Sequence, residues 1–209
     1  MSTKVFVSFR FKDEEDLKKE LDELFDSSNK IINRLEDEDR SEMSEETIRD
    51  YLYSKLKETS VTIIILTPKA IEYDKDILGR YDDWLYDELR YSLEDRKENR
   101  TNGAIALYTD ESKNTLFEEV YYECDRCQKT HRVKEIKNFN NLVRMNMLNI
   151  KDDYKYNQCE GFYDSDKDSY ISLIVFDEFK KDPNKYIDKA KDKRDRKEEF
   201  SIIKRMPDH

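Results

Sequence analysis

The chain has 209 residues, and its 39 basic side chains against 49 acidic ones give a formal charge of −10. This length fits one domain with a proper core, and an aromatic content of 12% argues against a disordered chain even though 42% of the residues are charged. Three glycines are too few for the glycine-rich loops that hold phosphate in Rossmann and P-loop sites. Two histidines leave little for serine-histidine catalysis, so any catalysis must depend on carboxylates.

The charge balance, the chain start and the cysteines restrict partners and compartment. A net charge of −10 repels nucleic acid, and no apolar run approaches the ~20 residues that span a bilayer, so we expect neither nucleic acid nor a membrane as partner. Residues 1–4 lead into a strand-like run instead of a signal-peptide core, which predicts a cytoplasmic protein. Three cysteines then favour reduced thiols or a metal over a disulfide framework.

The first half of the chain alternates between β-prone apolar runs and amphipathic helical patterns. Residues 4–9 are typical of a central parallel strand, and 61–66 is the clearest buried strand before Pro68 interrupts the pattern. In chain order, the sequence first predicts a strand at 4–9 and then a helix from Asp13 with Leu17, Leu21, Leu24 and Phe25 on one face. A weak strand at 31–35 and a solvated acidic loop at 36–40 follow. It then predicts a helix capped by Ser44 with Leu52 and Leu56 inward, strand 61–66, a helix from about 82 to 99 with Leu85, Leu89 and Leu93 inward, and strand 103–108.

The second half departs from this alternation before returning to it. Residues from about 110 to 169 contain a predicted hairpin, 117–124 and 130–136, and read as an insertion with a subdomain of its own. Strand 170–176 and a helical region around Pro183 complete the pattern. Strand-helix alternation implies right-handed crossovers and a parallel sheet, so we predict a three-layer α/β domain over residues 1–209 with the insertion embedded in it.

The strongest candidate site combines an aromatic residue with a carboxylate near the start of the third long helix. Trp84 and Glu88 are four residues apart, so they share one face of that helix. Ligands of open α/β sheets bind at the carboxyl ends of the strands, which places the segment from Ser8 through Phe9 to Arg10 on the same rim. Arg10 could hold an anionic group and Phe9 could stack on a base. On spacing alone, the commoner interpretation is a core-edge tryptophan beside a solvated glutamate.

Three segments resemble TIR domains. Residues 4–10 (Lys-Val-Phe-Val-Ser-Phe-Arg) look like the first TIR box, and the helix segment Trp84 to Leu89 resembles the W-x-x-x-E-[LI] box. Between them, Val61 to Pro68 is similar to the TIR strand that ends in a hydroxyl residue and proline, and Asp39 lies near the position of the second box. The Tyr-Asp-Asp-Trp segment and its long loop resemble most closely the TIR-like ThsB group of bacterial Thoeris antiphage systems. The resemblance covers about the first half of the chain.

The resemblance implies a flavodoxin-like fold and an enzyme that cleaves the nicotinamide glycosidic bond of NAD, its substrate. The product would be an ADP-ribose derivative, in the Thoeris setting a cyclic or otherwise modified nucleotide that a separate effector senses. Glu88 falls on the catalytic glutamate of the family, and Trp84, Phe9, Arg10, Ser8 and Asp39 fall on or beside positions of the nucleotide cleft. One carboxylate can stabilise or orient an oxocarbenium-like centre through the ribose hydroxyls, without metal or histidine.

Two other functions remain open. A TIR-like scaffold would bind partners without turnover, and a flavodoxin-like deoxyribosyltransferase would use a glutamate on the N-glycosidic bonds of deoxynucleosides. The loop after the second strand lacks the glycine and proline common in TIR domains, so the family's assembly contacts do not carry over, and a homo-oligomer remains an open alternative.

A cysteine pair in the insertion suggests a metal. Cys124 and Cys127 are spaced as in zinc knuckles and fall in the predicted hairpin turn, with Cys159 as a third ligand. His131 lies four residues beyond Cys127, and on an extended strand at ~3.3 Å per residue it would be more than 10 Å away. The sequence therefore predicts structural zinc on the three cysteines, against the alternative of ordinary turn cysteines, with His131 a poor fourth ligand unless the chain folds back.

Overall fold

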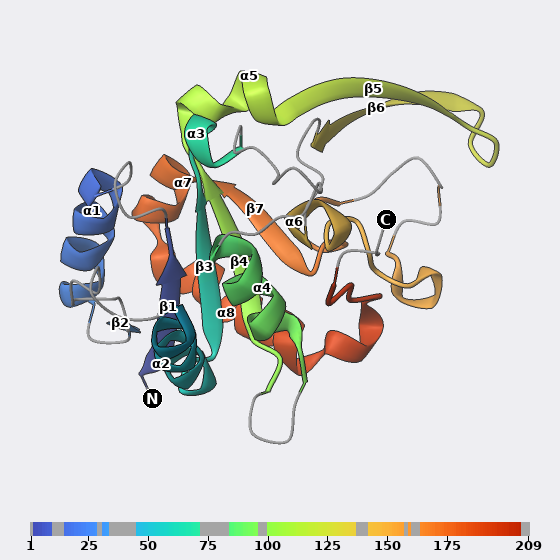
Figure 1. Ribbon diagram of the computed structural model, residues 1–209. Coiled ribbons are helices and arrows are strands. Elements are labelled where there is room, and N and C mark those ends of the chain that lie inside the picture. Colours follow the sequence, from blue (N-terminus) through green and yellow to red (C-terminus); the bar gives the residue numbers. More distant parts are fainter. Residues whose placement is uncertain are drawn as a thin grey trace.

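A computed structural model describes the molecule at residues 2–9, 15–28, 31–33, 45–71, 84–95, 100–136, 142–156, 159 and 164–205. Its centre is a five-stranded parallel sheet in the order β2-β1-β3-β4-β7 (Figure 1). This is the doubly wound order of flavodoxin-like folds, with the reversal of strand order between β1 and β3. The sheet strands are β1 (Thr3–Ser8), β2 (Ile31–Asn33), β3 (Val61–Leu66), β4 (Gly103–Tyr108) and β7 (Ile171–Val175).

Helices cover both faces of this sheet, which confirms the predicted three-layer α/β fold. One face packs against α1, α7 and α8, and the other packs against α2, α4 and α6. The helices are α1 (Glu15–Asp26), α2 (Glu45–Lys57), α3 (Pro68–Ile71), α4 (Trp84–Leu93), α5 (Lys113–Leu116), α6 (Leu142–Met145), α7 (Phe176–Lys181) and α8 (Pro183–Asp195), with single 3₁₀ turns η1 (Asp110–Ser112), η2 (Asp152–Tyr154) and η3 (Lys197–Glu199).

Strand β3 shows why two helical layers are needed. All six of its residues are buried, and alternate side chains of a strand point to opposite faces. Ile63 and Ile65 therefore join the core under α1 and α8, whereas Ile64 and Leu66 join the core under α4. A strand that is apolar on both faces cannot leave either of them in water, so the continuous apolar run predicted the buried central position correctly.

The predicted inward stripes of two helices are confirmed, but one helix is shorter than expected. In α1, Leu21 and Phe25 are buried in the core, and in α4 the buried stripe is Leu85, Leu89 and Leu93. The sequence predicts that the second of these helices runs to about residue 99, but α4 ends at Leu93. The prediction is therefore wrong at residues 94 and 95, the described residues that follow α4. The backbone N–H of Asn102 donates to the Ser92 carbonyl at 2.8 Å, so the residue before β4 lies against the end of α4.

The insertion is an antiparallel hairpin followed by α6, and its base shares the core of the sheet. Strands β5 (Phe117–Cys124) and β6 (Lys129–Ile136) pair over their full length, close to the predicted bounds. Ile136 and Leu142 are buried in the same cluster as Ile64. Figure 1 shows the hairpin extending away from the sheet. No described helix is both long and apolar enough to cross a membrane.

The close approach of α8 to β4 explains why residue 103 is a glycine. A Cβ atom at Gly103 would lie 2.6 Å from the carbonyl carbon of Ala190 and 3.2 Å from its Cβ. Because the first of these is backbone, the helix itself would have to move. Gly103 therefore sets how closely α8 packs on the sheet.

We expect Gly103→Ala to lower the free energy of unfolding by about 2 kcal/mol or more, because overpacking forces backbone shifts. Urea denaturation of the two proteins measures this. A Gly-to-Ala change without a clash stabilises through the unfolded chain, so equal or greater stability of the variant would contradict the close approach.

Lys193 is a buried amine between α8 and β7. It is 4% exposed, and its Nζ donates to the Ser172 Oγ at 2.8 Å. Burial lowers the pKa of Lys193 to about 8, and the carboxylate of Asp166 only partly opposes this effect. The folded protein therefore releases a proton from Lys193 at a pH where the unfolded chain still holds it.

Because the pKa of Lys193 is lower in the folded than in the unfolded protein, we predict that the free energy of unfolding rises with pH. Between pH 8 and the ordinary lysine pKa of 10.5, the unfolded state binds more protons than the folded state, so the free energy of unfolding increases. Relative to Lys193→Met, the wild type should gain about 2 kcal/mol between pH 7 and pH 10. Urea unfolding at both pH values tests this, and a constant difference between the two proteins would contradict the assignment.

Candidate functional site

The carboxyl end of β1 places a buried hydroxyl on the α4 face of the sheet. Ser8 pairs in register with Ile64, and paired residues of neighbouring strands share a face. Ile64 packs with Leu85 and Leu89, so Ser8 faces the layer that contains α4. Ser8 is 2% exposed, and its Oγ has no hydrogen-bond partner among the residues that the structure describes. A buried polar atom of this kind is rare and indicates a place where another group can bind.

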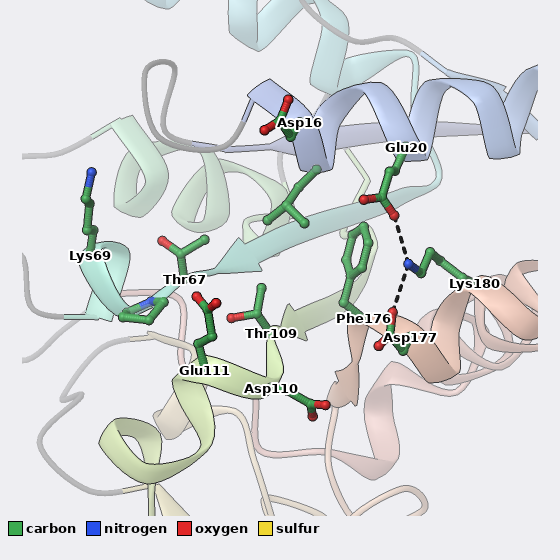
Figure 2. Close-up of a pocket in the computed structure, with 12 residues that line it drawn as sticks. Asp16, Glu20, Thr67, Lys69, Thr109, Asp110, Glu111, Phe176, Asp177 and Lys180 are labelled. Carbon is green, nitrogen blue, oxygen red and sulfur yellow. Dashed lines mark hydrogen bonds and ion pairs between the residues drawn. The ribbon is translucent and has the colours of Figure 1, made fainter.

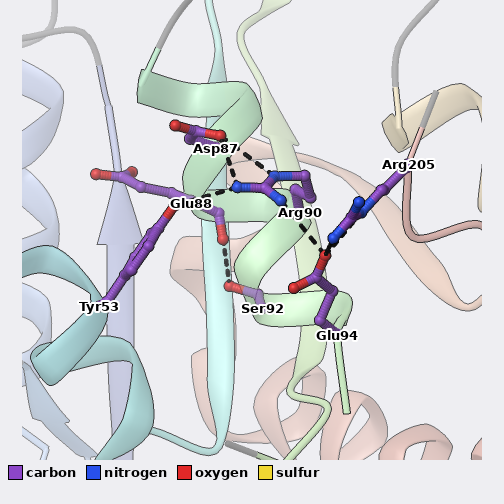
Figure 3. Close-up of polar contacts among 7 residues, drawn as sticks. All are labelled: Tyr53, Asp87, Glu88, Arg90, Ser92, Glu94 and Arg205. Atoms are coloured by element: carbon purple, nitrogen blue, oxygen red, sulfur yellow. Dashed lines mark hydrogen bonds and ion pairs between the residues drawn. The ribbon is translucent and has the colours of Figure 1, made fainter. Parts of the chain in front are cut away.

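Glu88 lies on the same layer, in α4. The preceding and following core residues, Leu85 and Leu89, hold this part of the helix on the sheet, and Glu88 itself is only 7% exposed. Figure 3 shows its side chain directed away from Arg90, to the side of α4 on which Tyr53 of α2 lies. The interpretation of Glu88 as an ordinary solvated helix glutamate is therefore wrong, because its carboxylate is largely removed from water.

A directed series of hydrogen bonds fixes α4 on β3 at the level of Glu88. Asn102 donates through Nδ2 to the Thr62 Oγ1 at 3.3 Å, and the Thr62 and Ser92 hydroxyls are 2.8 Å apart. Ser92 in turn donates to the backbone carbonyl of Glu88 at 2.7 Å. Since Ser92 uses its proton on Glu88, it accepts from Thr62, which accepts from Asn102. These hydrogen bonds form a relay from Asn102 through Thr62 and Ser92 to Glu88, which joins residues up to 40 positions apart. No sequence motif indicated this relay.

Arginines contact the carboxylates of Asp87, in α4, and of Glu94, the residue that follows α4. Arg90 contacts Asp87 at 3.1 Å and Glu94 at 3.4 Å, and also donates to the hydroxyl of Tyr53 at 3.2 Å. Arg205 contacts the same Glu94 oxygen at 3.0 Å (Figure 3). Burial alone would lower the pKa of Arg90, but Asp87, Tyr53 and Glu94 together raise it. Asp87 and Glu94 thus each have an arginine partner.

A hollow of about 590 Å³ lies at the carboxyl edge of the sheet, but on the α1 side. Leu17 and Phe176, which line it, belong to the core beneath α1 and α8, the face opposite Glu88. Figure 2 shows Lys180 between Glu20 and Asp177, both at 2.8 Å. The charged lining comprises the carboxylates of Asp16, Glu20, Asp110, Glu111 and Asp177 and the amines of Lys69 and Lys180. This excess of negative charge disfavours a pyrophosphate.

The structure puts two of the residues predicted for the nucleotide site on one face of the sheet and a third on the other. Ser8 and Glu88 share one face, whereas Phe9 packs against the core on the α1 side, with the Lys18 Nζ 5.5 Å from its ring centre. Arg10 and Asp39 lie outside the described residues, and only the backbone of Trp84 is described, at the start of α4. These three stay predictions.

The predicted metal ligands converge, and a fourth joins them. The ligand atoms of Cys124, Cys127, His131 and Cys159 all lie within 4.8 Å of one another. The Cys127 Sγ and the His131 Nε2 are 3.0 Å apart, so the expectation that an extended strand keeps them more than 10 Å apart is wrong. Residues 125–128 form a turn in which Gln128 has φ 54°, and the chain folds back on itself there. The four residues form a cluster that could hold a metal ion.

No family model matches the chain.

The buried Ser8 hydroxyl, which lacks a hydrogen-bond partner among the described residues, leads to a prediction about stability. Removing a buried polar atom without a partner relieves its desolvation cost, so Ser8→Ala should raise the free energy of unfolding by about 1 kcal/mol. Ser112→Ala is a matched control, because Ser112, in η1, is also fully buried but donates to the Leu66 carbonyl at 2.8 Å. That control should lose about 1 kcal/mol in urea unfolding. Equal losses in both variants would show that the Ser8 hydroxyl has a partner.

Proposed function

We propose that this protein is a TIR-like enzyme that cleaves the nicotinamide glycosidic bond of NAD and releases an ADP-ribose-derived, cyclic or otherwise modified, signalling nucleotide. Its product would be read by a separate effector protein in antiphage defence, in the cytoplasm. The proposal assigns Glu88 as the catalytic carboxylate and Ser8, with Trp84 and Arg10, to the substrate cleft. It follows the resemblance of the first half of the chain to TIR domains of the ThsB group.

The single observation that carries the proposal is the burial of Glu88. A catalytic carboxylate gains from low exposure, because electrostatic interactions with a developing positive charge are stronger away from water. Glu88 is 7% exposed on the same face of the sheet as the Ser8 hydroxyl, which has no hydrogen-bond partner within the described ranges. The hydrogen-bond relay through Ser92 fixes the backbone of Glu88, which would hold the carboxylate in place for the reaction.

The chemistry needs few groups from the protein. Nicotinamide leaves NAD as a neutral molecule, and the ribose carbon that it leaves develops positive charge. A carboxylate beside that sugar stabilises the charge or orients the ribose hydroxyls, and neither a metal nor a histidine takes part. A hydroxyl such as that of Ser8 can bond to a polar group of the ligand. The acidic hollow on the α1 side, by contrast, would repel the pyrophosphate.

Nicotinamide release from NAD by the purified protein, alone and with lysate of infected cells, is the direct test. Glu88→Gln keeps the shape and removes the charge, and we expect it to lower the turnover about 10²-fold or more. Glu94→Gln is the matched control, since Glu94 is also 7% exposed and directly follows the same helix but contacts Arg90 and Arg205. It should keep its turnover per folded molecule.

The other outcomes separate the remaining functions. Equal turnover by wild type and Glu88→Gln would remove the role assigned to Glu88. Activity on deoxynucleosides in place of NAD would identify a deoxyribosyltransferase. A protein that turns over neither substrate but binds a TIR-containing partner or an effector would be a scaffold.

A further inference from the structure

The tip of the β5–β6 hairpin has an unusual pattern of burial. Tyr121 is 64% exposed and Tyr122 is 39% exposed, as expected for a hairpin that extends from the domain. Cys124, at the end of β5, is nevertheless only 2% exposed. A buried residue at the tip of an exposed hairpin requires another segment to cover it, and Cys159 lies in that segment.

The hairpin geometry directs three ligands to one side. Cys124 pairs with Lys129, and Tyr122 pairs with His131. Because cross-strand partners share a face and residues two apart on a strand share a face, Cys124 and His131 project from the same side of the hairpin. The turn places Cys127 against His131, at 3.0 Å between Sγ and Nε2. Cys159 completes the set from a segment 28 residues beyond His131.

The distances between the ligand atoms and the types of ligand favour zinc. Bonds of about 2.3 Å to sulfur and 2.0–2.1 Å to nitrogen give a tetrahedron whose ligand atoms are about 3.5–3.8 Å apart. Four atoms within 4.8 Å of one another reach that arrangement by shifts of less than about 1 Å. Three thiolates and one imidazole are the ligands of closed, structural zinc sites, which leave no position for substrate.

The backbone around the ligands is held by further hydrogen bonds. The N–H of Gln128 donates to the Cys124 carbonyl at 2.7 Å, which closes the turn that contains Cys127. The Nζ of Lys155 donates to the Cys159 carbonyl at 2.8 Å. Zinc with three thiolates carries a net charge of −1, and the ammonium of Lys155 supplies a positive charge beside it.

We propose that Cys124, Cys127, His131 and Cys159 bind one structural Zn²⁺ that fastens the tip of the hairpin to the main body of the domain. This inference does not depend on the proposed NAD chemistry. His131, the residue that an extended strand would have kept away, is the fourth ligand.

The segment that supplies Cys159 is itself attached to the body, so the metal would join two distant parts. Ile150 forms a β-bridge with Phe200, a residue of the core under α4. The N–H of Lys151 donates to the Glu199 carbonyl at 2.9 Å, and its Nζ donates to the Glu198 carbonyl at 2.6 Å. The base of the hairpin is in the core through Ile136. Zinc would then anchor the opposite end of the hairpin.

Metal analysis of the protein purified without added chelator tests the ligand set. We expect about one zinc per chain in the wild type and less than about a tenth of that in Cys127→Ser, Cys159→Ser and His131→Ala. Tyr121→Ala is the matched control, because Tyr121 lies on the opposite face of the hairpin from Cys124 and should leave the zinc content unchanged. Glu88→Gln should also keep its zinc, so failure of the NAD proposal and failure of this one are distinguishable.

Limited trypsin digestion tests the anchoring role and needs no variant. Arg126 and Lys129 are exposed and lie in or next to the turn. Removal of zinc from the wild type by a strong chelator should accelerate cleavage after these residues about tenfold, because the tip loses its second attachment and opens locally. Added Zn²⁺ should restore the slow rate. A cleavage rate that the chelator does not change would overturn the anchoring role.

Three results would overturn the site itself. Iron in place of zinc would exclude the assigned metal. A full zinc content in His131→Ala or Cys159→Ser would exclude that ligand. A metal-free protein with fewer than three titratable thiols after denaturation without reductant would show that the cysteines form a disulfide instead. If the variants do not fold, wild-type protein loaded with Co²⁺ still decides the question, since tetrahedral thiolate coordination gives strong visible absorption bands and a metal bound elsewhere does not.

Discussion

The structure depends on the burial of β3 from both sides. Every residue of this strand is buried, and its alternating side chains require one helical layer under Ile63 and Ile65 and another under Ile64 and Leu66. Each layer has its own consequence. The layer of α1, α7 and α8 packs closely enough on β4 that Gly103 has no room for a side chain. The layer of α2 and α4 brings Glu88 to the face on which Ser8 is buried.

Polar contacts within that second layer fix the position of the helix that carries Glu88. An apolar stripe such as Leu85 and Leu89 sets which side of α4 faces the sheet, but side-chain packing alone lets a helix shift along its axis. The hydrogen bond between the Thr62 and Ser92 hydroxyls, inside the core, holds α4 in register with β3. The backbone of Glu88 is held by the same contact, through Ser92.

The sequence predicted the helices and strands but not the contacts between residues far apart in the chain, for physical reasons. Apolar runs and helical stripes depend on local spacing, so the strands and the inward faces of α1 and α4 could be found from it. Contacts between distant residues leave no such trace, which is why the Asn102 relay was not predicted. The prediction for His131 was wrong for a different reason. It placed His131 far from Cys127 by assuming an extended strand, whereas the intervening turn reverses the chain.

The relay from Asn102 to Glu88 also limits how the sequence can diverge. Each of its hydroxyls both donates and accepts, so replacing Thr62 alone by valine would leave the Asn102 amide and the Ser92 hydroxyl each with one partner fewer inside the core. Replacing both hydroxyl residues by apolar ones of similar size leaves neither hydroxyl without its partner, and the Asn102 amide keeps its bond to the Thr59 Oγ1 at 3.1 Å. Evolutionary change at positions 62 and 92 should therefore be correlated, with homologues keeping both hydroxyls or losing both together.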